Sequence, residues 1–114
     1  MKKEAIIKKI KNLLENFILN KVSGKEFEQS YMGLWKYIRD NKISYTSDIQ
    51  TILDEIWGDV DAFVSDIILF RKLKQKSNYS KKEFDLIHID EEELKKRVKV
   101  AIQRLNKLDT RNDD

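Results

Sequence analysis

The sequence predicts an all-α protein, an antiparallel four-helix bundle, on three observations. Apolar residues recur at intervals of three and four along four segments, as they do on the buried face of a helix. The 114 residues include no proline and three glycines, the two residue types that most often interrupt helices. Charged residues make up 38% of the chain and apolar residues 40%, which suits amphipathic helices around a core. Connections of short or moderate length favour antiparallel neighbours.

The first two predicted helices have clear apolar stripes. The first covers about residues 2–20, and its stripe contains Ile6, Ile10, Leu13, Leu14, Phe17 and Ile18. The second begins at Ser23. Ser23 and Glu26 have the spacing of a capping box, in which each side chain accepts a hydrogen bond from the other residue's backbone amide. The stripe of this helix contains Phe27, Tyr31, Leu34, Trp35 and Ile38.

The third predicted helix is the longest, over about residues 48–72, and follows a loop at residues 40–46. Ser47 and Gln50 have the spacing of a second capping box. A wide apolar stripe continues from Ile49 to Ile67. Gly58 interrupts this stripe and lowers the stability of the helix by about 1 kcal/mol relative to alanine. A bend or break of the helix near Gly58 is therefore an alternative to a straight helix.

The remainder of the chain is predicted as a loop followed by the fourth helix. Residues 74–82 are rich in Lys, Ser and Asn, which is typical of a solvated loop. Residues 84–89 predict a short extended piece or a turn at the end of the bundle. The fourth helix starts at Asp90, with Glu93 completing a third capping box. We expect one domain over residues 1–114, with a polar, frayed tail from about Asp109.

Several classes of function have little support in the sequence. The chain has no cysteine, so a disulfide framework and thiolate metal sites are excluded. His88 is the single histidine, and we expect it to be a partly buried structural residue. No glycine-rich phosphate loop is present. We therefore expect no enzyme, no catalytic residue, no metal site and no cofactor. The apolar runs are too short to span a bilayer, which needs about 20 residues, and no signal peptide is recognised, so we expect a cytoplasmic protein without a membrane partner.

The charge pattern of the third segment carries the main functional prediction. Residues 43–70 include six acidic residues and no Lys or Arg, in a chain whose net charge is +3. On a helical wheel Glu55, Asp59 and Asp66 fall within about 20° of Asp48, so these four acids lie on one flank of the apolar stripe. Asp54 and Asp61 form a smaller pair on the other flank. A single-sign stripe attracts a basic partner. The helical spacing of Trp57 favours a core position, and a half-exposed Trp57 beside the stripe is the alternative, as a candidate interface anchor.

The acidic residues also fit simpler structural roles. Runs of charge are often solvated helix faces, and lysines of the first helix would neutralise the stripe if they lay across the bundle from it. A second acidic run contains Asp90, Glu91, Glu92 and Glu93. Acidic residues are favoured in the first turn of a helix by its dipole and free amides, and for that run alone this structural role is the favoured one.

Four short segments resemble one known family. They are LENF at 14–17, GKEF at 24–27, IWGDVDAF at 56–63 followed by Asp66, and IDEEEL at 89–94. In this order and spacing, from about residue 13 to 105, they resemble the bacterial self-protective colicin-like immunity proteins, including the colicin D and contact-dependent inhibition types.

The resemblance implies a four-helix immunity protein that binds a cognate toxin. It implies a bacteriocin or contact-dependent inhibition toxin, with a tRNA-cleaving nuclease as the target in the colicin D type. Such an immunity protein covers the basic active-site cleft of the nuclease domain. Asp59, Asp61 and Asp66 match one acidic motif of the family, and Asp90, Glu91 and Glu92 match a later one. With the stripe residues Asp48 and Glu55 and the anchor Trp57, they form the predicted toxin-binding set. We expect a 1:1 complex and a monomer when the protein is free.

Two further hypotheses come from other classes of protein. The net positive charge and the sequence pI of about 9.0 fit a nucleic-acid-binding module that uses lysines of the first helix and residues 71–82. In the leading hypothesis, that of an immunity protein, the chain does not bind nucleic acid directly. A structural adaptor or self-assembling helical protein is the third possibility.

Overall fold

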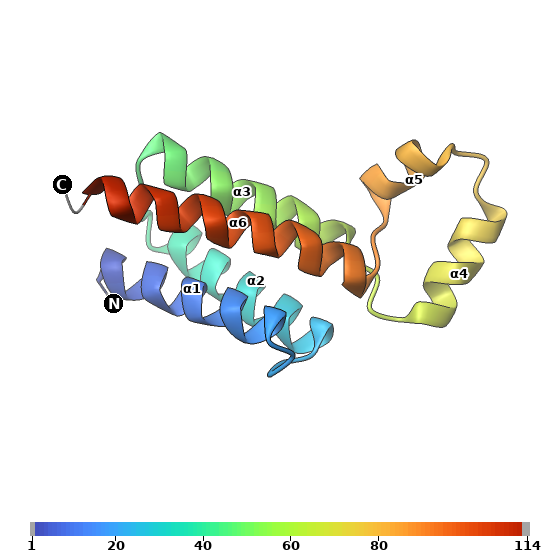
Figure 1. Ribbon diagram of the computed structural model, residues 1–114, viewed down its shortest axis with the longest axis horizontal. Coiled ribbons are helices and arrows are strands. Elements are labelled where there is room, and N and C mark those ends of the chain that lie inside the picture. The colour runs from blue at the N-terminus through green and yellow to red at the C-terminus, as the bar shows by residue number, and fades with distance from the viewer. Residues whose placement is uncertain (1, 113–114) are drawn as a thin grey trace.

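The computed structural model describes residues 2–112, without the side chains of residues 85, 86 and 109–112. The described chain is all-helical, which confirms the predicted class (Figure 1). The predicted four-helix antiparallel bundle is not confirmed as such, because residues 2–112 form six helices. These are α1 (Lys3–Ile18), α2 (Gly24–Asp40), α3 (Ser47–Ala62), α4 (Ile67–Lys76), α5 (Lys81–Ile87) and α6 (Glu91–Asn112).

Four of the helices, α1, α2, α3 and α6, pack around one hydrophobic core and form what we call the helical body. α6 lies against α1 and α3, and α2 lies against the same two helices. The apolar stripes predicted for these segments supply the core. Phe17 and Phe27 stack inside it with ring centroids 4.4 Å apart, and Tyr31 is fully buried beside them.

The third helix ends ten residues earlier than the sequence predicts. α3 runs through Gly58 without a break and stops at Ala62, where Phe63 turns to extended backbone. The amide of Val64 donates to the carbonyl of Ile89, and the amide of Ile89 donates to the carbonyl of Ala62, both at 2.9 Å. This parallel bridge joins Phe63 and Ile89, whose side chains are both buried in the core. Tertiary pairing therefore overrides a helical periodicity that continues past Ala62.

Residues 67–87 leave the helical body as a helical arm. The arm contains α4 and α5, which Figure 1 shows projecting from one end of the body. It includes residues 74–82, so the predicted loop there is wrong except at 77–80. Phe70 and Phe84 pack edge to face, with centroids 5.5 Å apart, and join the two helices. Both rings are buried, but neither belongs to the core of the body.

The predicted capping boxes have three different outcomes. The box at Ser23 is confirmed, because its hydroxyl accepts from the amide of Glu26 and the Glu26 carboxylate accepts in return. The box at Ser47 is wrong: α3 is preceded by Thr46, whose side chain makes no capping hydrogen bond. At Asp90 the carboxylate accepts from the amide of Glu93 at 2.9 Å, so half of the predicted pair forms.

The tail predicted from about Asp109 is helical as far as Asn112, because α6 continues to that residue. Residues 113 and 114 lie outside the described residues. The described molecule is elongated, with principal extents of 49, 28 and 23 Å, because the arm continues the long axis of the body.

Candidate functional site

Arginines of α6 face the acidic flank of α3. The guanidinium of Arg97 lies 2.9 Å from Asp59 and 3.3 Å from Glu93. One turn of α3 earlier, Arg104 forms an ion pair with Glu55. The basic partners of the acidic flank therefore come from α6, and not from the first helix as one of the alternatives supposed.

The ion pair of Arg97 and Asp59 is partly withdrawn from solvent. Their side chains are 29% and 23% exposed. The pKa of Asp59 is raised, chiefly by burial. The hydrogen bond and charge of Arg97 lower it, and the charges of Glu55 and Glu93 add to the rise. Asp59 is thus a structural carboxylate that depends on its cation.

The four stripe residues are not brought together as one single-sign surface. Glu55 and Asp59 are paired with arginines, and Asp66 lies beyond the end of α3. Asp48 is exposed in the first turn of α3, beside a shallow hollow that Arg104 and Lys107 also line.

Three of the predicted site residues stabilise helix ends. The carboxylate of Asp66 accepts from the amides of Ile68 and Leu69 at 2.9 and 3.2 Å, which caps α4. Asp90 caps α6 in the way described above. Glu91 reaches from the start of α6 to the amide of Gly24 at 2.5 Å, where it meets the positive end of α2.

The opposite flank of α3 has a different character. Trp57 packs on Trp35 of α2 with ring centroids 5.3 Å apart, and both side chains are half-buried. Asp54 and Asp61, three residues before and four residues after Trp57, are exposed on the same side of α3. We call these four residues the tryptophan face.

The tryptophan face keeps its negative charge. Asp54 accepts a hydrogen bond from the neutral amide of Gln50 at 2.9 Å. Within residues 2–112, Asp61 has neither a hydrogen bond nor an ion pair from its side chain. Arg39 lies over the ring of Trp35, 5.6 Å from its centroid, at the far edge of the face. The sequence predicts a core position for Trp35, since it falls on the apolar stripe of its helix.

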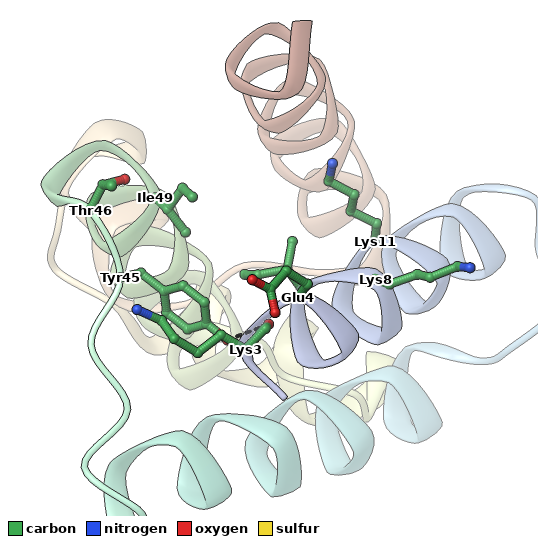
Figure 2. Close-up of a pocket in the computed structure, with 8 residues that line it drawn as sticks. Lys3, Glu4, Lys8, Lys11, Tyr45, Thr46 and Ile49 are labelled. Atoms are coloured by element: carbon green, nitrogen blue, oxygen red, sulfur yellow. Dashed lines mark hydrogen bonds between the residues drawn. The ribbon is translucent and has the colours of Figure 1, made fainter. Parts of the chain in front are cut away.

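A separate hollow of about 380 Å³ lies between the first turns of α1 and α3 (Figure 2). Lys3, Lys8 and Lys11 surround it together with Glu4, and the Tyr45 hydroxyl donates to the carbonyl of Lys3 at 2.9 Å. Its charged groups are mostly exposed at a wide opening, where a small anion would keep most of its water. Such a hollow is a poor match for an enclosed ligand or substrate site.

His88 packs its ring against Phe84 with centroids 5.4 Å apart and is half-buried, as expected for a structural residue. In the part of the chain that the structure describes, no cluster of His, Cys, Asp or Glu side chains is arranged to hold a metal ion. None of the helices within residues 2–112 has the length and apolar character needed to cross a bilayer.

Comparison with known proteins gives one match. A model of the family described as bacterial self-protective colicin-like immunity matches residues 5–105. This range includes all of the predicted toxin-binding residues. No curated protein and no solved structure matches the chain.

Proposed function

Because the chain belongs to the bacterial self-protective colicin-like immunity family, we propose that it neutralises a cognate toxin nuclease by binding it one to one through the tryptophan face. The toxin is a bacteriocin or a contact-dependent inhibition toxin, and its tRNA-cleaving domain has a basic cleft. The immunity protein covers that cleft and excludes the RNA substrate.

The observation that supports this surface is a half-buried tryptophan pair between two carboxylates that have no cationic partner among the described residues. Tryptophan is enriched at the centres of protein interfaces, where its burial slows dissociation. Asp54 and Asp61 are available to a basic partner without first breaking an internal ion pair. Their charge speeds the encounter, since complementary charges act mainly on the association rate.

The other acidic residues of the predicted set have different parts in this proposal. Glu55 and Asp59 are held by α6, so a toxin would have to compete with arginines for them. Asp66, Asp90 and Glu91 act through the helix ends that they stabilise. The exposed Asp48 and Glu92 add to the long-range field that attracts a basic domain.

The test begins with identification of the toxin. The protein, immobilised, is used to capture partners from its source cells, in parallel with a Trp57→Ala, Asp61→Lys double variant. We expect one large secreted or surface protein to be retained by the wild type and lost with the variant. Its C-terminal domain, expressed alone, should stop growth and cleave tRNA, and co-expression of the wild-type chain should restore growth.

A matched variant separates the two flanks of α3. Glu55→Gln changes an exposed acid of the same helix by one charge and leaves both tryptophans in place. It should protect cells almost as well as the wild type, whereas Trp57→Ala alone should weaken toxin binding by about 2 kcal/mol, or about 30-fold. Circular dichroism shows whether each variant is folded, and light scattering with chromatography gives the stoichiometry. Equal protection by the double variant and the wild type would rule out the tryptophan face.

A further inference from the structure

The helical arm exposes large aliphatic side chains where α4 begins. Ile67, Ile68 and Leu69 are 55%, 63% and 47% exposed. Three exposed aliphatic residues in a row differ from the single, scattered apolar residues that are normal on a protein surface. The helical body does not cover them, because the arm projects away from it (Figure 1).

The same arm is basic. Residues 67–87 include one Arg and five Lys against Glu83 and Asp85, and residues 67–82 hold all six cations and no acidic residue. These cations are Arg71, Lys72, Lys74, Lys76, Lys81 and Lys82, and all of them are exposed. None of them forms an ion pair with the described residues. The arm thus holds an excess of positive charge next to uncovered aliphatic surface.

Helical geometry places the two kinds of residue on one face of α4. Phe70 points toward α5, against Phe84. Ile68, Lys72 and Lys76 are spaced by four residues and lie on the opposite, outer face. The outer face therefore begins with an aliphatic turn and continues with lysines, which is the arrangement of a short amphipathic surface.

We propose that the outer face of the arm docks the protein onto an anionic lipid surface. The lysines bind headgroup phosphates, and Ile68 and Leu69 enter the boundary between headgroups and acyl chains, as interfacial amphipathic helices do. No helix crosses the bilayer. The helical body, with its tryptophan face, stays in water beside the membrane.

The composition of the face favours lipid over other anionic partners. Protein interfaces are enriched in Tyr, Trp and Arg and depleted of Lys, whereas this face combines lysine with isoleucine and leucine. Single-stranded nucleic acids bind through basic side chains and through aromatic rings that stack on bases, and exposed aliphatic side chains find no partner there. A lipid interface satisfies both the cations and the aliphatic groups.

Sedimentation with vesicles tests this proposal without any toxin. The full chain is mixed with vesicles of phosphatidylcholine alone, or with roughly a third of phosphatidylglycerol. We expect binding to the anionic vesicles only, with loss in about 1 M salt, where the Debye length is about 3 Å. Lys72→Gln with Lys76→Gln should weaken partitioning by about 25-fold, since one cation near such a surface contributes about fivefold. Ile68→Ser with Leu69→Ser should weaken it by about tenfold.

Two control variants make the same kinds of substitution outside the arm, in and next to α1. Lys8→Gln with Lys9→Gln removes two exposed lysines from α1, and Leu19→Ser removes a leucine that is 62% exposed at the end of α1. Both should partition like the wild type. Failure of the wild type to sediment with anionic vesicles would overturn the proposal. Equal losses in the arm and control variants would also overturn it, because the binding would then follow net charge or total exposed apolar surface. Tighter binding to RNA than to vesicles would assign the arm to nucleic acid instead.

Discussion

The hydroxyl of Tyr31 joins α2 to α3 inside the core, and Tyr31→Phe measures what this one polar atom contributes. The hydroxyl donates to the carbonyl of Leu53 at 2.6 Å within buried surroundings. Leu53 lies in the middle of α3, so its carbonyl keeps the helical hydrogen bond in the variant. The loss is therefore that of one neutral hydrogen bond, about 1 kcal/mol at pH 7, which corresponds to a fall of roughly 4 °C in Tm.

The same substitution should become neutral and then favourable in alkali. Burial raises the pKa of Tyr31 well above the ordinary tyrosine value, and the charges of Asp54 and Asp59 raise it further. The folded protein then keeps a proton that the unfolded chain releases, so stability falls as the pH rises above about 10. The slope for one group is about 1.4 kcal/mol per pH unit. Because phenylalanine has no proton to lose, the stability curves of the two proteins should cross between about pH 10 and 11.

Urea unfolding followed by far-UV circular dichroism, at intervals from neutral pH to about pH 11, gives both curves. The difference between the two proteins cancels the titration of every other group that they share. Tyr79→Phe is the matched control, since it also removes one phenolic hydroxyl and Tyr79 is exposed on the arm. Wild-type and Tyr31→Phe curves that stay parallel over the whole range would refute the argument.

The remaining predictions concern close packing and a partly buried charge. Gly24→Ala should destabilise the fold by about 1–2 kcal/mol in thermal unfolding, because a Cβ there would lie 2.6 Å from the ring of Phe63 and 2.4 Å from a glutamate oxygen. Gly33 lies on the same helix, and a Cβ added there would have no neighbour within 4 Å. Gly33→Ala should therefore stabilise the fold by up to about 1 kcal/mol, and a loss of stability in this variant would contradict the reasoning. Arg97→Ala should cost about 1–2 kcal/mol at pH 7, because it leaves Asp59 half-buried without its cation. Burial raises the pKa of that carboxyl, so the deficit should shrink as the pH falls and the group takes up a proton. A deficit in urea unfolding that does not change with pH would count against the role of the ion pair.

Local signals in the sequence were sufficient for the helix class and for the start of α2. The capping box at Ser23 involves residues three apart, so it is visible without knowledge of the fold. The end of α3 was not predictable in this way. Phe63, Val64 and Ile67 continue the helical periodicity, and what stops the helix is a backbone bridge to Ile89, far along the chain.

The acidic flank shows a similar limit. A helical wheel places acids on one side of α3 but does not say which neighbouring helix faces that side, or how that helix is rotated. Arg97 and Arg104 could be assigned to Asp59 and Glu55 only once α6 was in place. The predicted site residue Trp57 does lie on an exposed flank, and its partner Trp35 was visible in the sequence only as one more apolar residue.

The bridge between Phe63 and Ile89 also has a consequence for how the chain tolerates change. The two ends of the arm leave and re-enter the body at hydrogen-bonded neighbours, and the core of the body contains neither of the arm's buried rings. A segment whose ends are this close behaves as an insertion between α3 and α6, and insertions at such points are tolerated because few contacts of the host depend on them. The arm and the body are therefore free to diverge at separate rates, and a graft of this segment onto another helical scaffold would need only two adjacent attachment points.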